Sequence, residues 1–555
     1  MNNRYINLLV SLSSYFIILI TGILNFSWNI SDHDDGYTIA YHAFGRNTEL
    51  QKSYAPYDSM CDRLLSFLPQ DYYLIFGSMM ISTLLASFFL IYILKKLALE
   101  ITGSKKVVVD IAALLFVLAL PEFLYMCFTF KSIIISLTFI FFSYYILLLS
   151  LRSNRSNSLF FLSILLFGIG VSLRWNHLAF GLVISIDFLY TNWRQGDVRL
   201  GFKKILTWGI GGIISSLLWI YLSGYSPAAL LNTATMGKLY IENLDSQIAL
   251  RIVEATLFLL PFTIMMFLFG LRRTFTAKSR NSRVIVILLF SLLPYLILGF
   301  LPSFKYLSML WLIFFFLFVQ ALWLISENKI LRKKVVVLSL LLILFIPWFI
   351  GVQVDVPTSN WGPGFDVKMS IEASKDELNK LRLDDRFKID RVQLTLAAGS
   401  ALPTSEGMRP LMGHFYTLWG GELKKLDRKL NSETDLIVKL AAESNAVVWI
   451  DRVNPYFLAS LSKGNYLPDK EWNQKGYFSA RSYRNNTGLS LGEFRLNSAK
   501  NLFDRDTIYQ EFKGDTIYAL FTYTSAMNKL ISDVESDSRF KIERIGPFSS
   551  KIVLN

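Results

Sequence analysis

Cysteine is nearly absent from this chain of 555 residues, which contains only Cys61 and Cys127. Two cysteines are too few for a disulfide framework, and these two lack the spacing of zinc ligands. The sequence therefore gives little support to redox or zinc chemistry, although a single bridge between the two cysteines stays compatible with it.

Charged residues are also scarce. They make up 18% of the chain, against 53% hydrophobic and 15% aromatic residues, and the mean hydropathy is +0.41. This composition excludes an ordinary soluble protein and predicts an integral membrane protein. The net charge of +14 does not indicate nucleic-acid binding, because residues 353–555 are nearly balanced, with 28 basic and 26 acidic residues. Almost all of the positive excess lies in residues 1–352, where it is a signal of membrane topology.

Hydrophobic stretches long enough to cross or nearly cross a bilayer recur along residues 1–352. We expect about eleven of them. They lie near residues 7–28, 73–94, 107–126, 132–151, 158–173, 177–191, 205–222, 256–271, 284–301, 307–325 and 335–352.

Basic residues gather in alternate loops between these stretches. Twenty of the 28 basic residues of the membrane part lie at the N-terminus or in these loops: Arg4, Lys95, Lys96, Lys105, Lys106, Arg152, Arg155, Arg194, Arg199, Lys203, Lys204, Arg272, Arg273, Lys278, Arg280, Arg283, Lys329, Arg332, Lys333 and Lys334. The positive-inside rule makes these loops cytoplasmic. The N-terminus is then inside and the C-terminus outside, and the first stretch is expected to be a retained helix rather than a signal peptide.

A second domain is expected after Val352, where apolar runs stop and the Pro- and Gly-containing segment "VDVPTSNWGPGFD" follows. We expect a membrane domain over residues 1–352 and a soluble, periplasmic α/β domain over 353–555. The pattern of the tail predicts helices at 370–381 and 432–444, and strands at 391–398, 445–451, 506–512 and 515–524.

The first outer loop, predicted over residues 29–72, opens on an acidic cluster, "NISDHDDGYTIAYHAF". A carboxylate placed just outside the bilayer can bind a cation, bind a sugar hydroxyl or act as a general base. The spacing is not that of an EF-hand, because Ile30 stands where the first aspartate is needed. A solvated turn built on Asp35 and Gly36 is the alternative that local sequence leaves open.

The order of motifs in this loop resembles the GT-C glycosyltransferases, membrane enzymes that use polyprenyl-phosphate sugars at the outer membrane face. The Asp34–Asp35 pair is similar to the acidic pair that begins their first outer loop, and "YAPYD", residues 54–58, is similar to their later Pro-containing segment. Two further matches are "GVSLRWNHLAFGL", residues 170–182, with an arginine at the outer end of a short helix pair, and Glu122 in the next outer turn.

Two GT-C families share different features with the chain. The first loop and "PSFKY", residues 302–306, resemble the Emb-type arabinofuranosyltransferases, but these are about twice as long, so their sugar is not carried over. Length, the number of spans and the large outer C-terminal region look more like the serotype-converting O-antigen glucosyltransferases of enteric bacteria. That resemblance implies transfer of glucose from undecaprenyl-phosphate glucose to lipopolysaccharide O-antigen, by a multi-pass protein of the bacterial inner membrane whose active site faces the periplasm.

The resemblance implies roles for several outer residues. Asp34 or Asp35 is the expected general base, and direct attack by the acceptor hydroxyl inverts the anomeric carbon. Arg174 and Lys305 are expected to bind the donor phosphate, because the leaving phosphate gains charge in the transition state. Further substrate-binding residues are expected to be Glu122, Tyr37, His33, Tyr54 and Lys52. No metal site or cofactor is indicated, and a divalent cation is left open.

Two other classes of function compete with this interpretation. A flippase or transporter of lipid-linked sugars needs polar groups near the bilayer midplane, and Asp110 and Asp187 lie near span ends without forming a matched pair in the sequence. A membrane-anchored binding protein needs one helix, so about eleven spans would have no purpose. The sequence therefore favours the glycosyltransferase.

Overall fold

The computed structural model describes most of the helical part and portions of the C-terminal part. The described residues are 3–25, 64–65, 67–69, 72–120, 123, 126–127, 132–151, 156–194, 196, 198–222, 261–276, 282–298, 308, 310–327, 352–357, 391–397, 400–403, 432–433, 436–437, 439–440, 447–450, 481–484, 487–490, 509, 516–520, 527, 531–532 and 534–555.

Ten α-helices and one short 3-10 helix occupy the described residues of the N-terminal part. They are α1 (Asn3–Asn25), α5 (Tyr72–Thr102), α6 (Lys106–Ala119), α8 (Ser132–Ser150), α9 (Ser156–Leu173), η1 (Trp175–Ala179), α10 (Phe180–Arg194), α11 (Val198–Leu222), α14 (Pro261–Thr276), α15 (Ser282–Leu298) and α16 (Trp311–Glu327). Each α-helix overlaps one of the predicted spans. The eleventh predicted span, 335–352, lies outside the described residues except for Val352, so the total number of spans stays a prediction.

Within the described residues, three helical stretches are both long and apolar enough to cross a membrane: Gly77–Thr102, Ser132–Ser150 and Gly201–Leu222. Shorter apolar helices accompany them, among them Asn157–Leu173 and Trp311–Glu327. The described part of the chain is therefore mostly helical and apolar, as its composition predicts.

Some helix ends differ from the predicted spans for local reasons. α6 ends at Ala119 rather than near residue 126, because Leu120 precedes Pro121 and adopts φ −118° and ψ 84°. A residue before proline is disfavoured in helical conformation. In the other direction, α5 continues beyond residue 94 to Thr102 and ends at Gly103, which has a positive φ of 65°. Lys95 and Lys96 therefore lie in a helix and not in the predicted loop.

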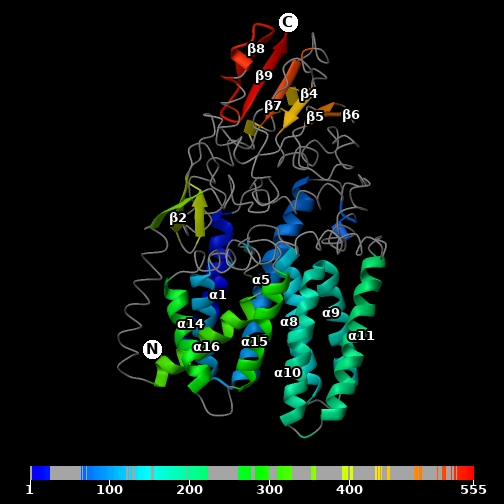
Figure 1. Ribbon diagram of the computed structural model, residues 1–555, viewed down its shortest axis with the longest axis vertical. Helices are drawn as coiled ribbons and strands as arrows, with labels where there is room; N and C mark the ends of the chain where they lie inside the picture. The colour runs from blue at the N-terminus through cyan, green and yellow to red at the C-terminus, as the bar shows by residue number, and fades with distance from the viewer. Residues whose placement is uncertain are drawn as a thin grey trace.

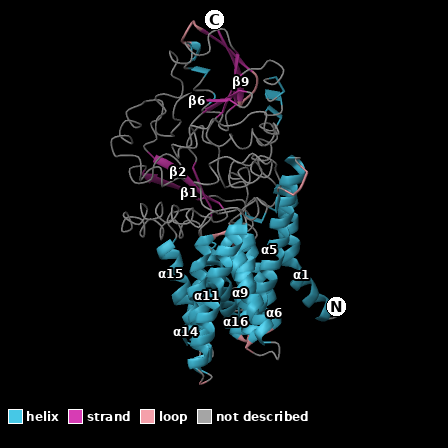
Figure 2. Ribbon diagram, turned by 90° about the vertical axis from the view of Figure 1, so that its right-hand side faces the viewer, coloured by secondary structure: helices cyan, strands magenta, loops and turns pink. Residues whose placement is uncertain are grey.

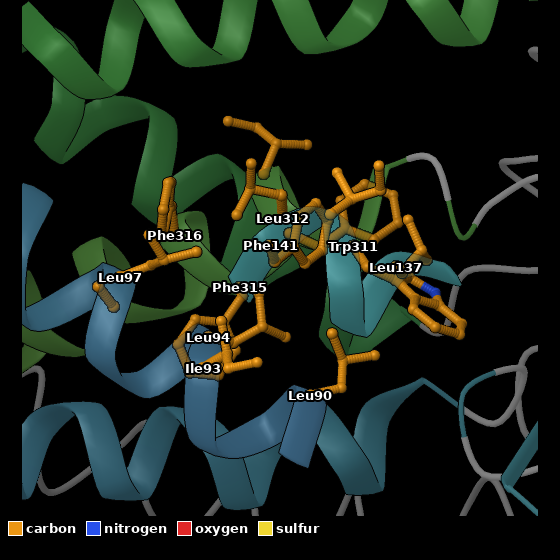
Figure 3. Packing of buried hydrophobic residues seen from close by; sticks show 14 of the residues in the cluster. Leu90, Ile93, Leu94, Leu97, Leu137, Phe141, Trp311, Leu312, Phe315 and Phe316 are labelled. Atoms are coloured by element: carbon orange, nitrogen blue, oxygen red, sulfur yellow. The ribbon is translucent and has the colours of Figure 1, made fainter. Parts of the chain in front are cut away.

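The helices pack into one bundle with a shared apolar core. α8 packs against α9 and α5, α9 against α11, and α16 against α14 and α6. Side chains from α5, α8 and α16 meet in the cluster shown in Figure 3, where Phe315 and Trp311 are among the fully buried rings. Small residues allow close approach: a Cβ on Gly168 of α9 would collide with Ser215 of α11.

Two sheets are formed by the described strands of the C-terminal part. The first is antiparallel, in the order β1-β2-β3, and the second has the order β6-β5-β4-β7-β9-β8, with β4 and β7 parallel and the other pairs antiparallel. The strands are β1 (Val352–Pro357), β2 (Arg391–Ala397), β3 (Ser400–Pro403), β4 (Val447–Ile450), β5 (Arg481–Arg484), β6 (Thr487–Ser490), β7 (Thr516–Leu520), β8 (Phe540–Arg544) and β9 (Ser549–Leu554).

The predicted elements of the tail are confirmed in part. Strands β2, β4 and β7 lie within predicted strands, and the described residues of 432–444 are helical. In the predicted strand 506–512 the one described residue, Tyr509, is helical. The apolar residues Ile508 and Phe512 stand four apart, which suits a helix as well as a strand. The predicted helix 370–381 lies outside the described residues, and the division into two domains at Val352 stays a prediction.

The helices and the sheets occupy different regions of the molecule. The helices stand side by side, and the six-stranded sheet with the C-terminus lies beyond one end of the bundle (Figures 1 and 2). The C-terminal end of α10 and the start of α11 lie at the opposite end (Figure 1). The side of the membrane on which each end lies stays a prediction.

Candidate functional site

The turn between α9 and α10 carries the one predicted site residue that the structure describes, Arg174. The backbone of Arg174 is extended, with φ −151° and ψ 96°, and it is followed by the single 3-10 turn η1. Its N–H donates to the carbonyl of Gly170 at 3.2 Å, and its own carbonyl accepts from the N–H of His177 at 3.0 Å. Arg174 is only 6% exposed. The sequence thus buries an arginine at the end of two helices.

Two side-chain hydrogen bonds tie this turn to α8. The Nε–H of Arg174 donates to the Oγ of Ser132 at 2.9 Å, and the Nδ1 of His177 lies 2.6 Å from the Oγ of Ser136. Ser132 and Ser136 are one turn apart on α8, and Arg174, just before η1, is joined to His177 by an i, i+3 backbone bond. The two bonds therefore set the register of the turn against α8.

The hydrogen bond of Ser136 to the backbone determines which nitrogen of His177 carries the proton. Ser136 donates its only hydroxyl proton to the carbonyl of Gly170 at 2.6 Å. Its oxygen can then only accept from His177, so we assign the proton of the imidazole to Nδ1. His177 lies in η1 and is 2% exposed. In a neutral ring with its proton on Nδ1, Nε2 is an acceptor.

Gly170 is needed at this point because α8 and α9 approach closely. A Cβ at Gly170 would stand 2.8 Å from Ile140 and 3.0 Å from the carbonyl oxygen of Ser136. The ring of His177 contacts Phe180 edge-to-face, with centroids 5.9 Å apart, and Phe180 in turn contacts Phe141 of α8. Polar and apolar contacts together hold the turn.

Of the predicted site residues, the structure describes only Arg174. Arg174 lies where the resemblance expects it, in a turn at the end of a short helix pair. The other predicted residues lie outside the described residues, so their positions stay predictions: Asp34, Asp35, Lys305, Glu122, Tyr37, His33, Tyr54 and Lys52. Sequence reasoning missed His177, Ser132 and Ser136. The i, i+3 spacing in "RWNH", residues 174–177, was the available signal for His177.

Two carboxylates that are buried among the described helices are paired with cations. Asp187 of α10 accepts from Arg283 of α15 at 2.7 and 2.6 Å and from the hydroxyl of Tyr144 at 2.5 Å. Asp110 of α6 forms an ion pair with Lys95 of α5 at 2.5 Å. Each aspartate therefore has a basic partner on a different helix, which the sequence alone does not show.

Among the described residues, no three His, Cys, Asp or Glu side chains lie close enough to hold a metal ion. The acidic cluster of the first loop lies outside the described residues, and a divalent cation at Asp34 and Asp35 stays a hypothesis.

Comparison with known proteins finds a likeness among the solved structures. No protein-family model matches the sequence, and no curated protein matches it. The structure is similar to the crystal structure of ArnT from Cupriavidus metallidurans in the apo state, with a TM-score of 0.52. The similarity covers 99% of this chain and 97% of that one, at 10% sequence identity. ArnT is a GT-C family glycosyltransferase. The chain therefore shares the fold of that structure. Its assignment to the GT-C glycosyltransferases and the resemblances to O-antigen glucosyltransferases and Emb-type enzymes stay predictions.

Proposed function

We propose that this protein is a membrane glycosyltransferase that transfers a sugar from a polyprenyl-phosphate donor to a glycan acceptor. The observation that carries the proposal is the fold, which is similar to that of ArnT along almost the whole chain. A fold alone does not determine an activity. The acidic pair Asp34–Asp35 and the buried Arg174 add the two kinds of group that this reaction needs, a base and a phosphate-binding cation.

The favoured donor and acceptor are undecaprenyl-phosphate glucose and lipopolysaccharide O-antigen, at the periplasmic face of a bacterial inner membrane. This choice rests on the architectural resemblance to serotype-converting glucosyltransferases. Arabinofuranose or another sugar, with lipid A or a protein as acceptor, is the alternative within the same fold.

Arg174 suits the phosphate of such a donor. A guanidinium is always charged and presents donors in a planar fork that matches phosphate oxygens. When the bond between the anomeric carbon and the phosphate oxygen breaks, the leaving phosphate gains negative charge. A cation already held in place by Ser132, at 2.9 Å, then stabilises the transition state more than the ground state. Lys305 is proposed as a second cation at this phosphate.

The acceptor hydroxyl requires a base. Asp34 or Asp35 is proposed to take its proton as the oxygen attacks the anomeric carbon from the face opposite the phosphate, which inverts the configuration. Glu122 is proposed to orient the acceptor. His33, Tyr37, Tyr54 and Lys52, from the same predicted loop as the base, are proposed to contact the sugars.

A flippase or transporter is less well supported, for a reason that the structure supplies. Carriers use ionisable groups inside the membrane to bind and release cargo or coupling ions. Asp187 and Asp110 are instead paired with Arg283 and Lys95. Each carboxylate is thus neutralised by a partner on another helix, as expected of groups that hold helices together.

The proposal is tested with purified protein, undecaprenyl-phosphate glucose and O-antigen polysaccharide. Wild type should transfer glucose, and either Asp34→Asn or Asp35→Asn should lower the rate by about 10²-fold or more, as expected when a general base is lost. Asp32→Asn is the matched control from the same cluster and should stay within a few-fold of wild type. If both Asp34→Asn and Asp35→Asn transfer glucose normally, the assignment of the base is wrong.

A further inference from the structure

The backbone of Arg174 takes part in a closed ring of hydrogen bonds. The proposed mechanism does not use these bonds. His177 Nδ1–H donates to Ser136 at 2.6 Å, and Ser136 donates to the carbonyl of Gly170, also at 2.6 Å. That same carbonyl accepts the N–H of Arg174, whose carbonyl accepts the N–H of His177. The bonds therefore form a ring that begins and ends at His177.

This ring surrounds the one residue of the turn that departs from helical conformation. Arg174 has φ −151° and ψ 96°, between α9 and η1, which both have helical backbone. The backbone of Arg174 makes one bond on each side, from its N–H to Gly170 and from the N–H of His177 to its carbonyl. At a helix end such bonds are few, so side-chain contacts add to the stability of the conformation. His177, through Ser136, supplies such a contact from α8.

The same helix face also holds the guanidinium. Ser132, one turn before Ser136 on α8, accepts the Nε–H of Arg174. The backbone and the side chain of Arg174 are therefore fixed against two adjacent positions of one rigid helix. Loss of the bond between His177 and Ser136 would free the backbone of the turn and shift the guanidinium relative to Ser132.

We propose that His177 is the positioning residue for Arg174. Its Nδ1–H, acting through Ser136 and the carbonyl of Gly170, holds the Arg174 guanidinium where the phosphate of a lipid-linked donor binds. This inference rests on the proposed function. It assigns to His177 no contact with the donor, and it makes the Nδ1 atom, rather than Nε2, the functional atom of the ring.

Asparagine and glutamine at position 177 distinguish a role of the Nδ1 atom from a role of the Nε2 atom. The N–H of an asparagine stands close to the place of Nδ1–H in histidine, whereas the longer glutamine brings its amide to the place of Nε2. His177→Asn should therefore retain the bond to Ser136, and His177→Gln should lose it. His177→Ala removes both nitrogens. Because Asn and Gln are both polar amides in the same buried position, their comparison is less affected by folding than the alanine variant alone.

The experiment measures transfer from undecaprenyl-phosphate glucose over a range of donor concentrations. His177→Ala and His177→Gln should lower kcat/KM for the donor by about 10²-fold, the size expected from misplacing a binding group by about 1 Å. His177→Asn should stay within about fivefold of wild type. The double variant His177→Ala with Arg174→Ala should be no worse than Arg174→Ala alone, because His177 acts only through Arg174.

Hydrogen exchange of the peptide that spans residues 168–180 gives a readout without activity. Exchange should be faster in His177→Ala and His177→Gln than in wild type, and close to wild type in His177→Asn. Rescue by Gln but not by Asn would overturn the inference and give His177 a direct contact through Nε2. Equal loss in Asn and Ala, or additive losses in the double variant, would overturn it as well.

Failure of this inference differs from failure of the proposed function. Binding of undecaprenyl phosphate alone is measured for wild type and for Arg174→Ala. If wild type transfers no sugar and binds no undecaprenyl phosphate, the proposed function is wrong and this inference falls with it. If wild type transfers sugar and Arg174→Ala does not, but His177→Asn behaves like His177→Ala, only the role of His177 is wrong.

Discussion

Arg283 of α15 donates hydrogen bonds to both carboxylate oxygens of Asp187 of α10, from Nε at 2.7 Å and from Nη2 at 2.6 Å. Tyr144 of α8 completes the cluster by donating to one of these oxygens at 2.5 Å. Asp187 is fully buried, and the three residues come from three different helices. This ion pair joins α15 to the helices that carry the candidate site.

Asp187→Asn should strongly destabilise the protein. Breaking a buried pair on one side leaves an uncompensated charge, at a cost of about 3–5 kcal/mol. The matched control is Glu327→Gln, which removes the partner of Arg273 in a half-exposed pair at 2.9 Å and should cost about 1 kcal/mol or less. Thermal unfolding in detergent measures both. Equal shifts for the two variants would contradict the structural role of Asp187.

Gly170→Ala should impair the candidate site as well as stability. The new Cβ would stand 2.8 Å from Ile140 and 3.0 Å from the carbonyl oxygen of Ser136, so α9 must move away from α8. Overpacking of this kind costs about 1–3 kcal/mol. Gly209→Ala in α11 is the control, because nothing lies within 4 Å of its added Cβ. That change should be neutral or slightly stabilising. If Gly170→Ala has the activity and stability of wild type, α8 and α9 are not so closely packed.

The topology predicts opposite accessibility for the two ends of the molecule. Lys203 in α11 and Lys541 in β8 are both exposed. In a Cys61→Ser background, where the remaining Cys127 is buried, a membrane-impermeant thiol reagent added to the periplasmic side should label Lys541→Cys but not Lys203→Cys. Both should react once the membrane is permeabilised. Labelling of Lys203→Cys from outside would reverse the assigned orientation.

The helices could be predicted from the sequence because hydrophobic runs need no information about their neighbours. The differences have local causes: Pro121 ends α6 early, and α5 continues through Lys95 because that side chain pairs with Asp110 across the helix interface. The candidate site was harder to predict. The motif indicates Arg174 as a candidate, whereas the contact that marks His177 is with Ser136, which is 41 residues away. Such a contact depends on how α8 and α9 pack.

The ion pairs show the same limit. Asp187 and Arg283 are 96 residues apart, so no spacing in the sequence connects them. In the sequence alone, Asp187 is a carboxylate near a span end with no evident partner, which is compatible with a transport role. Once the fold brings α10 and α15 together, the same residue becomes half of a structural pair.

The central claim is that the lipid-linked donor is consumed and not merely moved. The most direct measurement uses protein in liposomes with radiolabelled undecaprenyl-phosphate glucose and O-antigen acceptor, and follows label in the polysaccharide together with release of undecaprenyl phosphate. Wild type should form equal amounts of both products. Both should be lost with Arg174→Ala but not with Arg199→Ala, which lies at the opposite end of the bundle. Movement of intact labelled donor across the bilayer, with neither product formed, would contradict it.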